Sequence, residues 1–271
     1  MRNLWPQLLT LWCGAALVMN LGWAWQRRHN NIGIVDVLWA LSLGASAIWL
    51  AATGGGAPLP RTLLATLGGL WGSRLALHLA RRVLREPEDG RYRYLRTHWR
   101  DNQVKIFGFF QLQALLVPLF ALPFLAAAQN RDPELTPWTG LALLAWVLSV
   151  AGESVADSQL ARFRSNPANQ GRTCRTGLWR YSRHPNYFFE WVHWLSYLAL
   201  SIGSPLAWLA AIGPILMYVF LRWLSGIPFT EAQALRSRGD DYRHYQRQTP
   251  MFFPWFPQSE SSLSHRHGMD L

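Results

Sequence analysis

The sequence predicts an all-α integral membrane protein with seven transmembrane helices, an external N-terminus and a cytoplasmic C-terminus. Half of the 271 residues are hydrophobic, and the formal net charge is +11. The hydrophobic residues come in long blocks, and the basic residues, nearly all of them arginines, gather between these blocks. Such an arrangement indicates a chain that crosses a bilayer repeatedly, because a soluble domain disperses its apolar residues.

Seven segments have the ~20 mostly apolar residues that a membrane-spanning helix needs. In chain order the predicted spans are 5–25, 33–53, 62–80, 106–128, 138–160, 187–203 and 206–224. No small-residue cleavage site follows the first segment, and Arg27 and Arg28 come next, so we interpret it as an uncleaved helix. We expect a single membrane domain over 1–258 and a disordered polar tail over 259–271.

The distribution of basic residues gives an independent prediction of topology, because lysine and arginine accumulate in cytoplasmic loops. Segment 81–105 holds eight of them and segment 161–185 holds six, whereas loops 54–61 and 129–137 hold one each. The remaining loops continue this alternation, and five more arginines follow Gly226. The pattern fits only an odd number of spans, with the C-terminus in the cytoplasm.

Several ionisable side chains fall within the predicted spans, where they are costly unless they face a cavity or a partner. They are Asp36, Arg74, His78, Glu153, Asp157, Glu190, His193 and Arg222. Most of them lie in the cytoplasmic halves of their spans, beside the arginine-rich loops. They predict a polar cavity open to the cytoplasm, although ion pairs among the same residues could instead hold the helices together.

The segment from Glu153 to Glu190 leaves the membrane and returns to it. Pro185 and Asn186 suit the start of the returning helix, whose free backbone N–H groups favour phosphate. Four arginines of this segment could surround a polyanion: Arg164, Arg172, Arg175 and Arg183. Neither a GxGxxG motif nor a P-loop lysine is present, so a nucleotide would bind between helices. The alternative for any single arginine is contact with lipid headgroups.

Other classes of ligand are disfavoured. Cys13 lies in an apolar run and Cys174 in a loop, so we predict neither a metal site nor a disulfide framework. Nucleic acid is disfavoured because the arginines lie between apolar runs of bilayer length. Since arginine forms bidentate contacts with phosphate and carboxylate, an anionic ligand or anionic lipid is the expected partner.

Three stretches carry a family resemblance. GLWRYSRHPNYFFEW, preceded by ADSQLARF and followed by DDYRHYQRQTPMFFPWFP, resembles the C-terminal domain of steroid 5α-reductases. It is still more similar to a bacterial membrane family that shares this domain. The resemblance assigns 138–257 to this C-terminal part, and it extends more loosely through NIGIVDVLWA, WGSRLALHLARR and EDGRYRYLR. RHPNY alone is less specific, because isoprenylcysteine carboxyl methyltransferases have a similar segment.

The resemblance implies that the last three spans and the cytoplasmic loops hold NADPH. The family's cofactor-binding positions fall on Asp157, Arg164, Arg172, Asn186 and Glu190, and to these we add Arg183. The tail tyrosines, Tyr242 and Tyr245, occupy the region that closes over the cofactor. Glu153 departs from the pattern, because the steroid enzymes have Asn there.

A second departure concerns the substrate. Steroid reductases polarise the enone with a Glu on the second helix and a Tyr on the third, and this chain has neither residue in those spans. Asp36, together with His78 or Arg74, supplies the nearest chemical substitutes. The resemblance therefore implies the reaction class more strongly than a steroid substrate.

We therefore predict an NADPH-dependent reductase of a lipophilic enone or a similar activated double bond that enters from the bilayer. A hydride would reach the β-carbon, while His78 or a protonated Asp36 hydrogen-bonds the carbonyl oxygen as enolate charge develops. RHPNY supports an alternative, a membrane methyltransferase that uses S-adenosylmethionine. A non-enzymatic protein that binds anionic lipid would explain the arginines, but not the acidic residues of the fifth and sixth spans. We expect a monomer in a bacterial inner membrane.

Overall fold

The computed structural model describes residues 4–258, and none of these residues forms a β-strand. The longer helices are α1 (Leu4–His29), α2 (Ile34–Thr53), α3 (Pro58–Arg85), α5 (Gln103–Phe120), α7 (Pro137–Ser165), α8 (Pro185–Leu200) and α10 (Ile227–Gln248). The shorter ones are α4 (Gly90–His98), α6 (Leu122–Ala127), α9 (Ile212–Val219), the 3-10 turns η1 (Pro167–Asn169), η2 (Gly177–Arg180) and η3 (Ala207–Ala211), and the π-helical turn η4 (Phe220–Leu224). The all-helical prediction is confirmed.

Five helical segments among the described residues are long and apolar enough to cross a membrane. They are Leu4–His29, Ile34–Thr53, Gln103–Ala127, Pro137–Ser165 and Ala207–Gln248. The other two predicted spans do form helices. However, α3 carries five arginines and α8 has only 16 residues. Seven spans and their orientation therefore stay predictions, and the predicted tail 259–271 lies outside the described residues.

The helices divide between two compact units. Unit 1 is the described part of Met1–Ala142 together with Tyr197–Gly213, and unit 2 is the described part of Leu143–Ser196 and Pro214–Leu271. Unit 1 therefore contains α1 to α6, and unit 2 contains most of α7 and α8 and all of α10. The prediction of a single membrane domain is not tested by this division.

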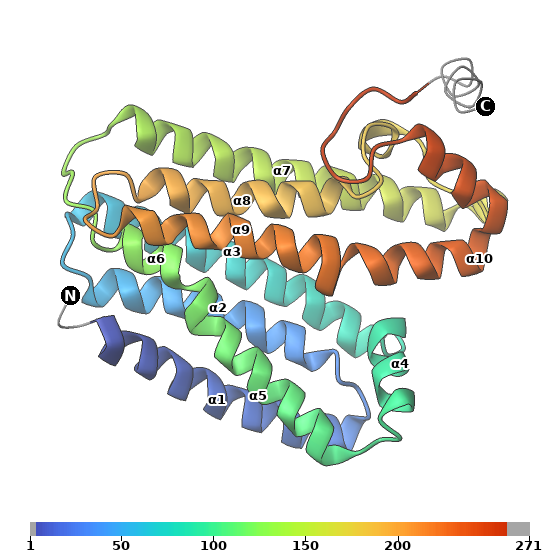
Figure 1. The fold of residues 1–271 in the computed structure, drawn as a ribbon, viewed down its shortest axis with the longest axis horizontal. Helices are drawn as coiled ribbons and strands as arrows, with labels where there is room; N and C mark the ends of the chain where they lie inside the picture. Colours follow the sequence, from blue (N-terminus) through green and yellow to red (C-terminus); the bar gives the residue numbers. More distant parts are fainter. Residues whose placement is uncertain (1–3, 259–271) are drawn as a thin grey trace, which may run out of the picture. The chain divides into compact units, whose positions relative to one another are not determined.

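In unit 1, α2 packs along α3, and α1 packs against α2 and α5 (Figure 1). Small residues permit the close approach of α2 and α3. A Cβ atom added to Gly72 would lie 2.7 Å from the Cα atom of Gly44, and one added to Gly68 would lie 2.4 Å from the Cβ atom of Ala47. Interfaces of this kind are typical of helices that associate by close packing inside a bilayer.

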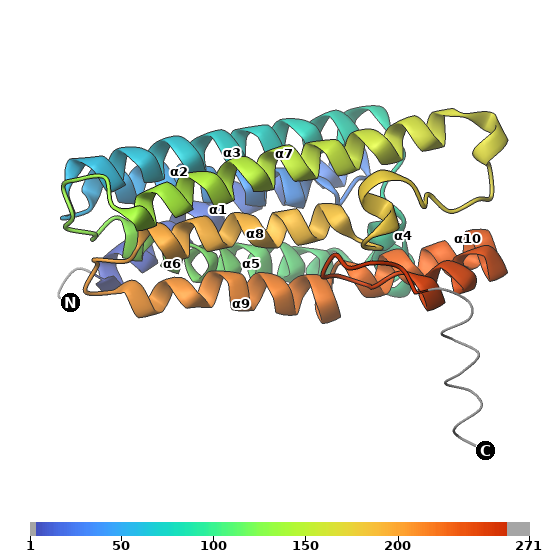
Figure 2. The same cartoon turned by 90° about the horizontal axis from the view of Figure 1, so that it is seen from above.

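In unit 2, α7 and α8 run side by side (Figures 1 and 2). A Cβ atom on Gly152 of α7 would lie 2.4 Å from the ring of Phe189 on α8, so this glycine lets the aromatic ring pack against the backbone. The indole Nε1 of Trp191 on α8 donates to the carbonyl oxygen of Pro214 on α9 (3.0 Å). As predicted, the helix that follows the arginine-rich loop begins at Pro185.

Two polar helices were not predicted from the sequence. Helix α4 forms inside the arginine-rich segment 81–105, and Asp89 caps it by accepting a hydrogen bond from the backbone N–H of Arg91 (2.8 Å). Helix α10 forms after Gly226 and bends at Gly239, whose φ of 52° is outside the helical range. Neither helix has the apolar content by which the spans were identified.

Candidate functional site

The residues predicted to hold a cofactor lie in unit 2, where two of them are in direct contact. Asn186, in the first turn of α8, donates from Nδ2 to the Asp157 carboxylate of α7 (3.2 Å). The other end of the Asn186 amide accepts from the backbone N–H of Tyr187 (3.0 Å), which fixes the side chain. Glu190 lies one helical turn further along α8 and, like Asp157 and Asn186, is half-buried.

The loop that joins α7 to α8 is held against the end of α7. Trp179 donates from its indole Nε1 to the carbonyl oxygen of Ala156 (2.9 Å), and Gln159 accepts from the backbone N–H of Leu178 (2.9 Å). Gly177 permits this approach, because its φ is +60° and an added Cβ atom would lie 2.4 Å from the Gln159 side chain. The loop therefore returns along the helix instead of extending away from it.

Glu231 of α10 is the centre of a buried polar cluster that the sequence analysis did not identify. Its carboxylate accepts from Arg183 Nε (2.7 Å) and Gln246 Nε2 (2.9 Å), and more distantly from the hydroxyl of Tyr242 (3.4 Å). His184 Nε2 lies 3.2 Å from the same carboxylate. The spacing of Glu231, Tyr242 and Gln246 along a polar helix is the only sequence signal for this cluster.

Arg183 is committed to protein acceptors. Besides Glu231, its guanidinium donates to the carbonyl oxygens of Gln246 (3.0 Å) and Thr249 (2.8 Å), and its side chain is only 10% exposed. These contacts join the start of α8 to the end of α10. Direct cofactor binding by Arg183 stays a prediction, and it would require this guanidinium to exchange partners.

Burial lowers the pKa of His184, by more than the neighbouring Glu231 carboxylate raises it, and the positive charge of Arg183 acts in the same direction as burial. The imidazole is therefore neutral at pH 7 and donates from Nε2 to Glu231. Its ring stacks on Tyr187, with centroids 5.5 Å apart and planes inclined by 7°. His184 of RHPNY thus has a packing role in this fold.

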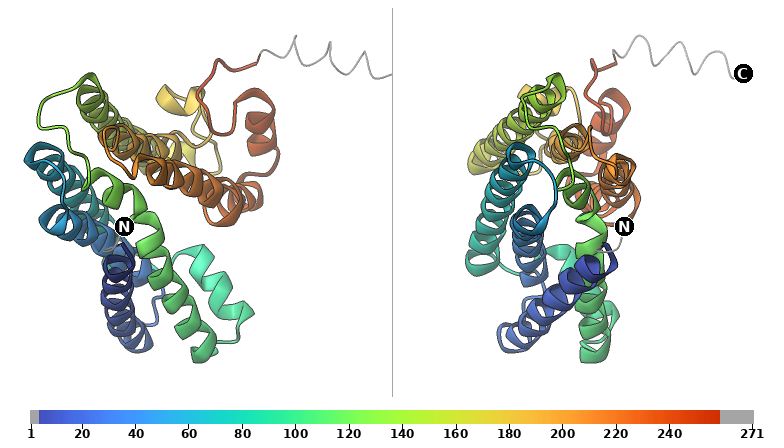
Figure 3. Two further views of the ribbon diagram at one scale, coloured as in Figure 1. Left: turned by 60° about the vertical axis from the view of Figure 1, so that its left-hand side comes forward. Right: turned by 90° about the vertical axis from the view of Figure 1, so that its left-hand side faces the viewer.

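The chain after α10 forms a strap, residues 249–258, that lies along the loop before α8 (Figure 3). The backbone N–H of Arg183 donates to the carbonyl oxygen of Pro250 (2.9 Å), and that of Trp255 donates to the carbonyl oxygen of Tyr181 (2.9 Å). The strap therefore adds backbone hydrogen bonds to a segment that lies outside any helix.

The two tail tyrosines, Tyr242 and Tyr245, lie near this loop. Tyr245 is buried, and its hydroxyl donates to the backbone carbonyl oxygens of Trp179 and Ser182. Tyr242 is buried as well and contacts Glu231. Both residues were predicted in the region that closes over a cofactor; in the structure Tyr245 binds the loop backbone and Tyr242 binds the Glu231 side chain.

The four arginines that could surround a polyanion, of which Arg164 lies in the last turn of α7, differ in their contacts. Arg175, like Arg183, is held by a distant acid. It donates to the Asp241 carboxylate (2.7 Å), and the other oxygen of that carboxylate accepts from the backbone N–H of Thr173 (2.7 Å). Arg164 and Arg172 are exposed. Both residues lie between Asp157 and Asn186 in the sequence.

In unit 1, Asp36 is paired rather than isolated. Its carboxylate accepts from the hydroxyl of Tyr92 (2.5 Å) and from Arg91 Nη2 (2.8 Å), both on α4. Burial, followed by the negative charge of Asp36, raises the pKa of Tyr92 well above its ordinary value. His78, the other predicted catalytic residue, is exposed on α3. Tyr92 was missed because it follows the spans in which a tyrosine was sought.

A second acid, Glu88, accepts hydrogen bonds from groups near that pair. It accepts from the backbone N–H of Ile32 (2.7 Å) and from Arg96 (3.1 Å), and Arg96 also binds Asp101 (2.6 Å). A cavity of about 30 Å³ lies nearby and has Asp36 and Tyr92 in its wall. It is the size of a water molecule rather than of an organic substrate.

Comparisons with known proteins place this architecture in a family. No solved structure matches the chain. The uncharacterized protein C594.04c of Schizosaccharomyces pombe is 27% identical over 270 residues, which cover 87% of this chain and 76% of that protein. The model of the family described as "Protein of unknown function (DUF1295)" matches residues 22–249. Since this match runs from within α1 to the end of α10, the protein belongs to the DUF1295 family.

Proposed function

We propose that the protein is an NADPH-dependent membrane reductase that reduces the activated C=C bond of a lipophilic enone. Two considerations support this proposal: DUF1295 is a steroid 5α-reductase-like family, and the C-terminal motifs resemble those enzymes. The observation that carries it is the hydrogen bond between Asn186 and Asp157, which joins α7 and α8 beside a loop with two exposed arginines.

The side chains of unit 2 suit a dinucleotide. The exposed guanidinium groups of Arg164 and Arg172 can each form a bidentate contact with a phosphate. A carboxylate such as that of Asp157 accepts hydrogen bonds of the kind that a ribose hydroxyl or a carboxamide donates, and Glu190 offers the same chemistry in the next turn of α8. The Arg183–Glu231 cluster would then hold the loop and the strap in place without touching the cofactor.

NADPH, when bound, would supply the hydride that reaches the β-carbon of the substrate. A donor of the protein would hydrogen-bond the carbonyl oxygen as negative charge develops there, and a proton would reach the α-carbon. Asp36 and His78 remain our candidates for this donor. Tyr92 is a further candidate, because its hydroxyl, which donates to Asp36, could donate to the carbonyl oxygen of the substrate instead. We further propose a bacterial inner-membrane location, a cytoplasmic cofactor cavity and a monomer.

The cofactor is tested by thermal unfolding of the detergent-purified protein with NADPH, NADH or S-adenosylmethionine. At a hundredfold excess over Kd, a ligand that binds only the folded state stabilises it by ~2.7 kcal/mol. We expect NADPH to raise Tm by several degrees and Arg172→Ala to reduce that shift. Arg236→Ala, which removes an exposed arginine from α10, is the matched control. Stabilisation by S-adenosylmethionine alone would favour the methyltransferase instead.

The acidic residue is tested by Asp157→Asn. Asparagine keeps an acceptor for Asn186, so the stability of the cofactor-free protein should change little. If the charged oxygen accepts from the cofactor, NADPH affinity should fall roughly tenfold to a hundredfold, the equivalent of ~1–3 kcal/mol. A variant with lowered stability and unchanged NADPH affinity would assign Asp157 to helix packing.

A further inference from the structure

One face of α7 carries an exposed apolar stripe that ends at an arginine. Leu148 is 51% exposed and Val155 is 46% exposed. Arg162 follows at the same seven-residue spacing and is also exposed. Since seven residues make nearly two full turns of an α-helix, the three side chains lie on one face. The stripe therefore leads from the middle of the helix directly to the guanidinium group.

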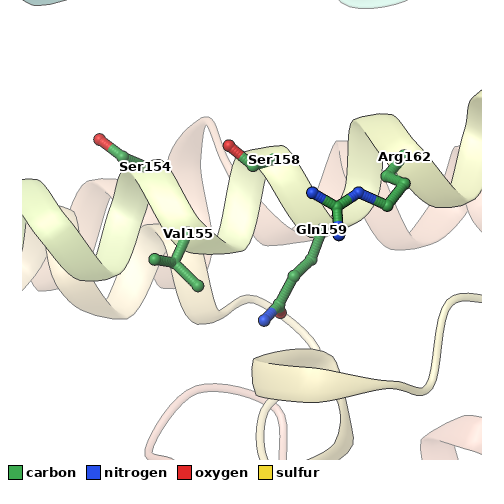
Figure 4. A pocket seen from close by; sticks show the side chains of 5 residues that line it. All are labelled: Ser154, Val155, Ser158, Gln159 and Arg162. Atoms are coloured by element: carbon green, nitrogen blue, oxygen red, sulfur yellow. The ribbon is translucent and has the colours of Figure 1, made fainter.

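A groove of about 330 Å³ opens at the end of this stripe, lined by Ser154, Val155, Ser158, Gln159 and Arg162 (Figure 4). The side chain of Arg162 bends back along α7 toward Ser158 and Gln159, which places its guanidinium over the groove. This direction is expected, because Cα–Cβ bonds in a helix tilt toward its N-terminus.

The groove is preformed on one side. Gln159 is fixed through its bond with the backbone N–H of Leu178, and Gly177 leaves room for that contact. Arg162 lacks an acidic partner within ion-pair distance among residues 4–258, unlike Arg175 and Arg183. The site therefore holds a positive charge that no side chain of the described chain neutralises.

The position of the groove along α7 corresponds to the headgroup layer of a bilayer. The helix has 29 residues, which is about 43 Å at ~1.5 Å per residue, whereas a hydrocarbon core is ~30 Å thick. Trp138, exposed at the start of α7, is an interfacial residue in type and position. About 30 Å further along the helix lies Ser158. The apolar stripe then spans hydrocarbon, and Arg162 reaches the opposite headgroup layer.

We infer that this groove binds the phosphate of one anionic phospholipid, whose acyl chain lies along Val155 and Leu148. Arg162 would form the bidentate contact, and the hydroxyl of Ser158 and the amide of Gln159 would donate to the remaining oxygens. This site is distinct from the proposed cofactor site. Asp157 and Arg164 are each two residues beyond a member of the stripe, which turns them ~200° around the helix to its other side.

The test is native mass spectrometry of the detergent-purified protein titrated with phosphatidylglycerol. The wild type should retain one phosphatidylglycerol molecule tightly, and Arg162→Ala should weaken that site at least tenfold. Arg180→Ala is the matched control, since it removes an exposed arginine of the same loop region and the same charge. It should bind like the wild type. Equal losses in both variants would show diffuse attraction to basic residues and overturn the site.

Three further arms identify the ligand. Diacylglycerol, which lacks the phosphate, should not occupy the site, and Val155→Gln should weaken phosphatidylglycerol by interrupting the acyl contact. Inorganic phosphate at millimolar concentration should not displace the lipid, and displacement would assign the groove to a free anion. NADPH stabilisation should be unchanged in Arg162→Ala. A lost NADPH shift with normal lipid retention would overturn the lipid assignment without contradicting the proposed reductase.

Discussion

The two arginine-rich segments look alike in composition, yet their structures differ. Segments 81–105 and 161–185 both carry the basic excess that is typical of cytoplasmic loops. The first also contains four acids of its own: Glu86, Glu88, Asp89 and Asp101. The second contains none, since no acid occurs between Asp157 and Glu190. Counting basic residues predicts topology, but the local acids determine what the arginines do.

The first segment pairs part of its basic charge at short range. Arg82 and Arg96 pair with acids of the same segment, whereas Arg91 pairs with Asp36 outside it. The second segment depends on α10, which supplies Asp241 and Glu231 to two of its arginines. The others among its described residues remain exposed: Arg162, Arg164, Arg172 and Arg180. A basic loop without acids is thus the better candidate for binding an external anion.

The largest expected effect comes from breaking the long-range pair in the second segment. Arg183→Ala removes the positively charged donor from the Glu231 carboxylate, to which Gln246 still donates, and takes the guanidinium away from two backbone carbonyls. Removal of one partner from a buried pair typically costs ~3–5 kcal/mol, so Tm in detergent should fall by roughly 10 °C. Arg180→Ala, from the exposed part of the loop, should leave Tm unchanged. If the two variants unfold at the same temperature, the cluster does not hold the loop.

A smaller loss is expected for the acid at the centre of the first segment. Glu88→Ala removes the acceptor of both Arg96 and the backbone N–H of Ile32, which should cost ~2–3 kcal/mol. Glu88→Gln keeps one acceptor and should lose less. Thermal unfolding measures the stability of both variants. NADPH should still raise the Tm of each folded variant. A Glu88→Ala protein as stable as the wild type would contradict the short-range pairing.

The third effect in size should be the pH dependence of stability, to which His184 of the second segment contributes. Burial lowers the pKa of His184 in the folded state, so the unfolded chain binds the proton more readily. The contribution of the neutral imidazole is complete above pH ~6.5 and declines as the pH falls below that value, by at most ~1.4 kcal/mol per unit. His184→Gln should flatten the Tm profile between pH 7 and 5. An unchanged slope in that variant would assign the acid sensitivity to other groups.

The smallest effect should come from the surface pairs of the first segment. Arg82 is half exposed and contacts Glu86 and Asp89. Solvent-exposed ion pairs contribute less than ~1 kcal/mol and weaken with salt. Arg82→Ala should therefore shift Tm by no more than about 3 °C, and by less at high ionic strength. A large, salt-independent loss would place this pair among the buried ones.

The sequence predicted the apolar helices well and the polar helices poorly. The second span was expected over 33–53 and forms over Ile34–Thr53, because a bilayer-length apolar run determines its own boundaries. Helices α4 and α10 were missed because polar helices lack that signal. The resemblance assigned Asp157 and Asn186 to one site, but their hydrogen bond was not predicted. Tyr92 and Glu231 were not found, since their partners lie 56 and 48 residues away in the chain.

The strap has a consequence for the order in which the protein is made. Arg183 obtains its partners from Glu231 and from residues near Pro250, and Tyr181 obtains its partner from Trp255. At synthesis rates of about 5–20 residues per second, the ribosome needs several seconds to proceed from Arg183 to Trp255. Throughout that interval the membrane helices can insert, but the loop before α8 has no strap. The proposed cofactor-binding loop is therefore completed last, after every predicted span has been synthesised.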